Sequence, residues 1–301
     1  MLVVFGHLTA GGDLSLKSIK ITRYLIYSFD MPMFIFMTGL FSKKKQGIKR
    51  ILSAYIIPYI IFDSIYVLWC MVVGKEANLL ILIPTFVYWY ILCIALQKLM
   101  ISCIRWKPVI FIIVLVIQVG TLFVSETVWR FLSIGRVGLL FPIFFLGYNF
   151  PIDKLYEMRQ KKFISFIIGF FSLSVTMALY KLKLVPISAT HNYYSSIAEL
   201  GVKYIYMLTT FGLFIALNSL IPNSRILNRW GRNSLLVYLL HPYMTDIIGY
   251  FVRHSVNSDY LSAVICITSS ILITAILSLD VFKNAYDYCM GKINKALRLM
   301  E

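Results

Sequence analysis

Two histidines and one arginine lie in segments where an apolar chain does not readily accommodate charge. His7 lies in the opening run MLVVFGHLTA, and His241 lies in the run SLLVYLLHPY. Arg136 begins the run GRVGLLFPIFFLGY, where Gly135 and Gly138 leave room for other groups to approach. An imidazole can act as a general base or a nucleophile near neutral pH, and a guanidinium can stabilise a developing oxyanion. Ionisable groups inside apolar segments are costly, so these residues are candidates for function.

An aspartate precedes a proline in the stretch YSFDMPMFIFMTGLFSKK. Pro32 suits the first turn of a helix and Asp30 suits its N-cap, so the pattern predicts a helix that begins at Met31. The dozen or so residues before Lys43 would cover only about 18 Å, so this broken helix should begin inside the outer leaflet. Asp30 would then either cap the helix or orient His7 and stabilise its protonated form.

The composition indicates that a membrane surrounds these groups. The 301 residues are 59% hydrophobic and 14% charged, and the mean hydropathy is +0.80. Soluble domains are about 45–50% apolar, and a membrane barrel would show alternating strands. Runs such as ILSAYIIPYIIFDSIYVLWCMVV are instead apolar on every side. The sequence therefore predicts an all-α, polytopic membrane bundle that forms a single domain over residues 1–301.

Ten apolar segments are long enough, or nearly long enough, to be membrane spans. The first is short, because ten residues cover about half of the hydrocarbon core. We therefore expect the complete first helix to begin about 10–20 residues upstream. The ten expected spans are 1–10, 31–42, 51–73, 83–102, 108–125, 137–150, 163–180, 200–221, 234–251 and 259–280.

The basic residues predict the orientation of the bundle. Most of them lie in the segments after even-numbered spans, which the positive-inside rule assigns to the cytoplasm together with both termini. The net charge of +16 then indicates contact with anionic lipid rather than with nucleic acid. His7 would lie toward the outside and His241 toward the inside, so the two need not touch. The basic residues concerned are Lys43, Lys44, Lys45, Lys49, Arg50, Lys98, Arg105, Lys107, Lys154, Arg159, Lys161, Lys162, Arg225, Arg229, Arg232, Lys283, Lys292, Lys295 and Arg298.

Five motifs occur in an order that resembles the membrane-bound acyltransferase family 3, and especially its capsule and fucose-type sugar O-acetyltransferases. They are VVFGH, FDMPMFIFMTGLF followed by KKKQGIKRILSAYIIPY, YWYILCIALQKL, GRVGLLFPIFFLGY and GRNSLLVYLLHPY. The resemblance covers nearly the whole chain. It implies transfer of an acetyl group from cytoplasmic acetyl-CoA to a sugar hydroxyl of a surface polysaccharide or its lipid-linked precursor. The expected setting is the plasma membrane of a bacterium, beside other polysaccharide-assembly proteins.

The resemblance also implies roles for individual residues. His7 matches the family's histidine at the end of the first helix, and Arg136 matches its outer arginine. Lys49 and Arg50 match the basic residues expected to meet the CoA phosphates. The family's usual FHMP is FDMP here, so the role of Asp30 must be argued from its own chemistry.

The donor arm has an expected route through the bundle. Pantetheine would enter from the cytoplasmic side and pass Trp89, Tyr90 and His241, the last of which matches a histidine in the family's SLYIYLLHP motif. No spacing of the five cysteines suggests a metal site, so acetyl-CoA is the only cofactor expected.

The chemistry leaves alternatives open. His7 could be the general base for the sugar hydroxyl or could carry the acyl group itself, with Arg136 stabilising the oxyanion. A transporter or flippase of a polysaccharide precursor would also need polar groups within the membrane. Such transporters often show matched broken helices in two halves, whereas only one is expected here, at Asp30. A sensor or scaffold role would leave His7 dispensable.

Overall fold

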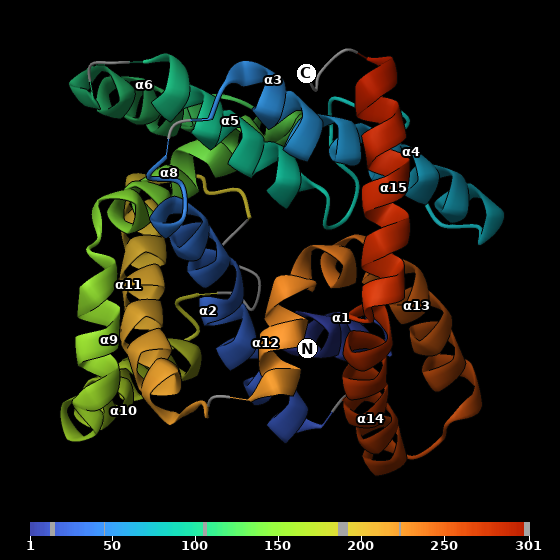
Figure 1. Cartoon of the computed structure of the whole chain (residues 1–301). Helices are drawn as coiled ribbons and strands as arrows, with labels where there is room; N and C mark the ends of the chain where they lie inside the picture. Colours follow the sequence, from blue (N-terminus) through green and yellow to red (C-terminus); the bar gives the residue numbers. More distant parts are fainter. Residues whose placement is uncertain (13–15, 45, 105–106, 186–191, 223, 298–301) are drawn as a thin grey trace.

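The computed structural model describes residues 1–12, 16–44, 46–104, 107–185, 192–222 and 224–297, and these residues form helices and connections without a β-strand. The all-α prediction is confirmed. In chain order the helices are α1 (Leu2–Gly11), α2 (Lys17–Leu40), α3 (Ile48–Ile51), the π-helix η1 (Leu52–Ile56), α4 (Ile57–Val72), α5 (Trp89–Cys103), α6 (Lys107–Gly120), η2 (Thr121–Phe123), α7 (Glu126–Arg130), η3 (Phe131–Ser133), α8 (Ile134–Asn149), α9 (Ile152–Gln160), α10 (Lys162–Lys181), α11 (Ile197–Leu220), α12 (Arg225–Arg232), α13 (Ser234–Ser255), α14 (Asp259–Leu277) and α15 (Asp280–Ala296) (Figure 1).

Within the described part of the chain, six stretches are long and apolar enough to cross a membrane by length and composition. Three shorter apolar helices correspond to the first, fourth and fifth expected spans, and α2 contains the second. The polytopic prediction therefore holds, and most bounds differ from the expected ones by a few residues. The six long stretches are Ile48–Val72, Glu126–Asn149, Lys162–Lys181, Ile197–Leu220, Ser234–Ser255 and Asp259–Leu277.

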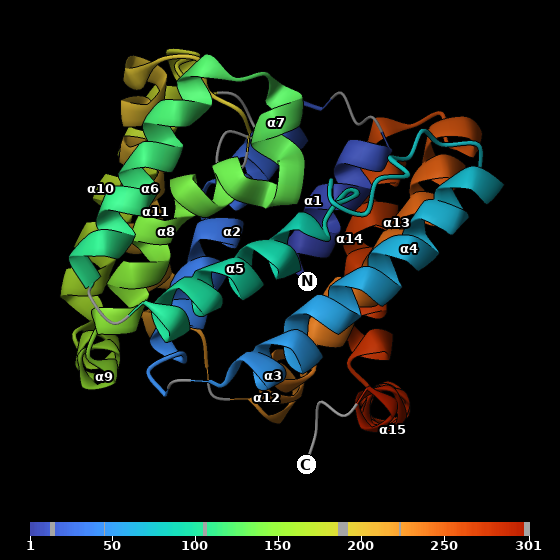
Figure 2. The same cartoon turned by 90° about the horizontal axis from the view of Figure 1, so that it is seen from above.

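The basic connections gather at one end of the bundle. Figure 2 shows α3, α9 and α12 at this end, which we call the basic end, and α7 at the opposite end, which we call the far end. α5 runs between a group that contains α1, α4, α13 and α14 and a group that contains α2, α6, α8, α10 and α11 (Figure 2). The loops after even-numbered spans thus share one end, as the charge pattern requires.

The predicted start of the second span is wrong. α2 is a single helix from Lys17 to Leu40 with Pro32 in its interior, and Asp30 lies within the helix rather than at a cap. A proline inside a helix removes one backbone hydrogen bond, which neighbouring helices can compensate in a membrane bundle. Residues 26–32 are all buried, and α1, α8 and α11 all pack against α2. The one broken helix expected from the sequence is therefore continuous.

Two glycines fix the crossing of α2 and α8. A Cβ atom on Gly39 would lie 2.0 Å from the carbonyl oxygen of Phe144, and one on Gly147 would lie 2.0 Å from that of Phe36. Neither backbone can move aside cheaply, so both positions require glycine. This contact sets the position of Arg136 at the first turns of α8 relative to α2.

Candidate active site

α1 and α13 lie against each other without intervening side chains near their far ends. A Cβ atom on Gly249 would lie 3.2 Å from the carbonyl carbon of Gly11, so the two backbones are nearly in contact. His7 lies one turn before Gly11, and His241 lies about two turns before Gly249. The two imidazole rings stack, with their centroids 5.3 Å apart and their planes inclined by 29°.

The prediction that His7 lies toward the outside and His241 toward the inside, so that the two need not touch, is not met, because their rings are in contact. That prediction took the depth of each histidine from the end of its own apolar run. The first run is too short to indicate how deep His7 lies in the bundle. The glycine contact places Gly11 level with Gly249, and this brings His7 down to the level of His241. The structure thus joins two residues that the sequence assigns to different parts of the site.

The tautomer of His241 follows from its backbone partners. Nδ1 lies 2.9 Å from the carbonyl oxygens of both Val237 and Tyr238, and carbonyl oxygens only accept hydrogen bonds. The neutral ring therefore carries its proton on Nδ1 and a lone pair on Nε2. His241 is fully buried, and its Nε2 has no hydrogen-bond partner among the described residues. This nitrogen is an unused acceptor beside His7.

The connection between α4 and α5 brings an aromatic ring onto the other side of His7. The Phe86 and His7 rings meet edge to face, with centroids 4.8 Å apart. Phe86 has a left-handed backbone conformation (φ 48°), which is costly for a phenylalanine. The buried carboxylate of Asp63 holds this segment by accepting a hydrogen bond from the Thr85 amide at 2.8 Å.

A cavity of about 180 Å³ opens beside His7. The last turns of α1 and α13 form its walls, together with Phe86 and the residue Lys75 that follows α4. The exposed ring of Tyr250 and the side chain of Arg253 complete the wall nearest the far end. The cavity therefore combines an imidazole, aromatic rings and charged groups, which is the usual make-up of a small-molecule site.

The carboxylate of this cavity belongs to Asp246. Its Oδ2 accepts hydrogen bonds from Tyr66 Oη at 3.0 Å and from Trp69 Nε1 at 3.1 Å. Its Oδ1 lies 2.6 Å from Nζ of Lys75, whose side chain is half exposed. Three donors from α4 and its C-terminal connection thus fix a negative charge one turn beyond His241 on α13.

Asp246 and Lys75 were not among the site residues predicted from the sequence. The available signal was a carboxylate inside an expected span, five positions after His241, and intramembrane carboxylates deserve the same attention as histidines. Lys75 gave no signal, because it follows the span and reaches the cavity only through the fold.

Arg136 lies in a different part of the bundle. Its guanidinium carbon lies 4.9 Å from the ring of Trp89 and 5.1 Å from that of Trp129. Gly135 permits this packing, because a Cβ atom there would lie 2.1 Å from the Trp129 ring. Arg136 is buried and does not belong to the wall of the His7 cavity.

A run of aromatic contacts connects the two centres. Tyr90 follows Trp89 in α5, and its ring centroid lies 5.2 Å from that of Tyr238. The Tyr238 ring lies 6.0 Å from that of His241, which stacks on His7. Trp89, Tyr90 and His241 are thus linked by a continuous set of ring contacts, and the route of the donor arm past them stays a prediction.

Asp30 lies on α2, one turn after a residue that contacts His7, but it is not part of the cavity wall. Tyr27, one turn earlier on α2, has its ring 6.2 Å from that of His7, and Gly6 leaves the space for it. The Asp30 carboxylate accepts a hydrogen bond from the Met31 amide at 2.6 Å and does not line the cavity. Its orienting role stays a prediction, and Asp246 is the carboxylate that shares the cavity with His7.

Lys49 and Arg50 lie on the short helix α3 at the basic end, and both are exposed. The π-helix η1 follows directly and leads into α4. The structure does not bring these two cations to the His7 cavity. They lie at the basic end of the bundle, where Figure 2 shows α3.

The fold and this site define a polytopic helical membrane protein with a stacked imidazole pair, of which one ring is fully buried and the other lines a cavity. The family model described as an acyltransferase domain matches residues 1–279 of the chain. The chain therefore belongs to acyltransferase family 3 and is a membrane acyltransferase. The comparisons with curated proteins and with solved structures returned no match.

Proposed function

We propose that this protein transfers an acetyl group from acetyl-CoA to a sugar hydroxyl of a surface polysaccharide or its lipid-linked precursor. The supporting observation is the cavity in which His7 meets the Asp246–Lys75 pair and the ring of Phe86. A sugar offers hydroxyls for the polar groups and an apolar ring face for the aromatic ones. The capsule and fucose-type resemblance supports this acceptor.

The proposed reaction needs one proton acceptor and one leaving group. The sugar oxygen attacks the thioester carbonyl carbon while a ring nitrogen of His7 takes the hydroxyl proton. The C–S bond then breaks, CoA leaves as a thiolate, and the imidazolium returns the proton to it. A general base of this kind contributes about 10²–10⁴-fold to the rate.

An acyl-histidine route uses the same groups in two steps. A ring nitrogen of His7 attacks the thioester, the C–S bond breaks, and the thiolate leaves. The sugar oxygen then attacks the acyl-imidazole, the C–N bond breaks to release the ring, and the hydroxyl proton passes to the CoA thiolate. His241, fully buried and stacked on His7, would hold the His7 ring in place on either route.

The two substrates would come from opposite ends of the bundle. On this proposal the basic end faces the cytoplasm of a bacterium, with both termini on that side, and Lys49 and Arg50 attract the CoA phosphates there. The acceptor reaches the cavity from the far end. Arg136, held between Trp89 and Trp129, would act on the donor arm, or on the oxyanion once the thioester is in place.

A direct assay tests the proposal. The protein, reconstituted in lipid nanodiscs, receives acetyl-CoA and a deacetylated surface polysaccharide, and release of the free CoA thiol is followed. We expect thiol release that depends on the acceptor and is lost in His7→Gln but retained in His254→Gln, which alters an exposed histidine. Unchanged thiol release with His7→Gln would contradict the mechanism. A transporter would bind the polysaccharide without cleaving any thioester.

A further inference from the structure

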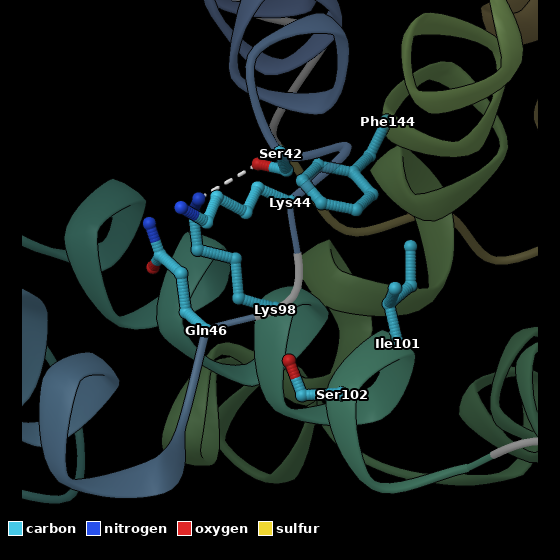
Figure 3. A pocket seen from close by; sticks show the side chains of 7 residues that line it. All are labelled: Ser42, Lys44, Gln46, Lys98, Ile101, Ser102 and Phe144. Atoms are coloured by element: carbon cyan, nitrogen blue, oxygen red, sulfur yellow. Dashed lines mark hydrogen bonds between the residues drawn. The ribbon is translucent and has the colours of Figure 1, made fainter.

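A second, narrow pocket lies at the basic end between α2, α5 and α8. Its volume is about 10 Å³, which is close to the space that one water molecule needs. Figure 3 shows the ammonium groups of Lys44 and Lys98 and the amide of Gln46 on the same side of the pocket, with Phe144 opposite. Two cations and an amide that converge on one small space favour an anionic oxygen as its occupant.

Lys98 is the unusual member of this group, because it is buried and has few partners. The residue is 6% exposed. Among the residues that the structure describes, its ammonium donates one hydrogen bond, to Ser42 Oγ at 2.7 Å, and has no carboxylate within ion-pair distance. The ring of Tyr55 lies 5.2 Å away. Two of the three ammonium donors are therefore unused, and burying such a charge is costly without an anion to compensate it.

Gln97 gives a second, independent observation one residue earlier. Its side chain is fully buried, and neither its amide oxygen nor its amide nitrogen has a hydrogen-bond partner within the described part of the chain. Gln97 lies one turn before Ile101, which lines the pocket, so the two share a face of α5. A buried amide that forms no hydrogen bond destabilises the folded state. A ligand that carries an amide would recover this energy.

The length of α5 relates this pocket to the rest of the site. From Trp89, which stacks on Arg136, to Lys98 the helix rises about 13.5 Å. The pantetheine arm of CoA contains two amide bonds. From phosphorus to sulfur it is about 16 Å long, taking the reach of an extended chain with as many bonds. A diphosphate held at Lys98 would therefore place the thioester at the level of Trp89 and Arg136.

We propose that Lys98 and Gln97 form the donor-binding site of this protein, in which Lys98 binds the diphosphate of CoA and Gln97 hydrogen-bonds an amide of its pantetheine arm. This inference rests on the proposed function for the identity of the donor. Gln97 and Lys98 lie in the motif YWYILCIALQKL, but the resemblance implied no role for either residue. The small pocket takes a phosphate oxygen, and the remainder of the diphosphate lies at its mouth near Lys44.

Equilibrium binding tests this site without requiring acyl transfer. The full chain in nanodiscs is titrated with radiolabelled CoA, and pantetheine is used as an unlabelled competitor. Lys98→Met keeps the alkyl stem but removes the charge, and Lys181→Met makes the same change at an exposed position at the far end of α10. We expect Lys98→Met to weaken CoA binding at least tenfold. The affinity for pantetheine, which lacks the diphosphate, should stay unchanged. Lys181→Met should bind CoA as the wild type does.

A second pair of variants keeps the test decisive if Lys98→Met does not fold. Ser42→Ala retains the charge but removes the hydroxyl that holds it, and it should weaken CoA binding several-fold. Gln97→Leu should weaken CoA and pantetheine by similar factors without lowering the thermal unfolding temperature, because no internal hydrogen bond is lost. A purely structural role of Gln97 would instead lower the unfolding temperature and leave the affinities for CoA and pantetheine at their wild-type values.

The outcomes separate this inference from the proposed function. Tight CoA binding by the wild type with no loss in Lys98→Met, or in Ser42→Ala if Lys98→Met does not fold, would overturn the donor site and leave acetyl-CoA as the donor. A wild type that binds no CoA would overturn both. Weakened CoA binding in the Lys98, Ser42 and Gln97 variants, with wild-type binding in Lys181→Met, would support the site.

Discussion

The rings of His7 and His241 stack at 5.3 Å although they come from opposite ends of the chain. The contact is possible because Gly11 and Gly249 allow α1 and α13 to touch. One ring lines the cavity, and the other is fully buried with Nε2 as an unused acceptor. The pair therefore has a partly buried member, His7, that lines the cavity and is suited to proton or acyl transfer, and a fully buried member, His241, suited to positioning it.

This arrangement predicts unequal effects at the two histidines. His7→Gln should lower the acyl-transfer rate by about 10²–10⁴-fold, because it removes the reacting imidazole. His241→Gln should lower the rate less and should also reduce thermal stability, because the buried ring fills space and donates to two carbonyls. Thiol-release kinetics and thermal unfolding measure both. Equal loss of rate in the two variants with unchanged stability would contradict the division of roles.

The two members of the Asp246–Lys75 pair should contribute differently to stability. Lys75→Met should cost less than about 1 kcal/mol, because the lysine is half exposed and surface ion pairs contribute little. Asp246→Ala should cost about 2–3 kcal/mol, because Tyr66 and Trp69 lose a charged acceptor. Chemical unfolding in detergent micelles checks this. Equal costs at the two positions would show that the ion pair, rather than the hydrogen bonds, holds Asp246.

The Asp63 carboxylate should control the segment that carries Phe86. In Asp63→Ala the Thr85 amide loses its acceptor, so its hydrogen exchange should accelerate and the acyl-transfer rate should fall at least tenfold. Hydrogen exchange with mass spectrometry measures the first effect. Asp153→Ala, which removes an exposed carboxylate on α9, is the matched control. Faster exchange without loss of rate would show that Phe86 is not needed for catalysis.

The crossing of α2 and α8 should tolerate no side chain. Gly147→Ala should destabilise the protein by about 1–3 kcal/mol or more, because the added Cβ meets the backbone of Phe36. Gly201→Ala in α11 meets nothing within 4 Å and should stabilise the helix by about 0.5–1 kcal/mol. Thermal unfolding of the two variants compares the same chemical change in two environments. Similar stabilities would contradict the close crossing.

Much of the architecture could be predicted from the sequence, because hydropathy and length determine membrane helices almost alone. The break at Asp30 was wrong for a specific reason. Capping and proline rules describe helix ends exposed to water, whereas α2 passes through a bundle whose neighbours cover the freed backbone groups. Local sequence could not show that cover.

Individual residues of the site could be predicted from the sequence, but the way in which they come together could not. His7, Arg136 and His241 were recognised as costly polar residues, but the glycine contact that sets the level of His7 is a property of two helices. Asp246 was overlooked although it lies inside a span, and Lys75 reaches the cavity from a connection. Contacts between distant segments decided these cases, and no local pattern encodes them.

Proton NMR of surface polysaccharide tests the central claim most directly. Three otherwise identical strains are compared: one without the gene, one with the wild type, and one with His7→Ala at matched membrane abundance. Acetyl signals on the polysaccharide that appear only with the wild type are the predicted result. Normal acetylation with His7→Ala would make His7 structural, and a change in polymer amount without a change in acetylation would contradict the acetyltransferase account.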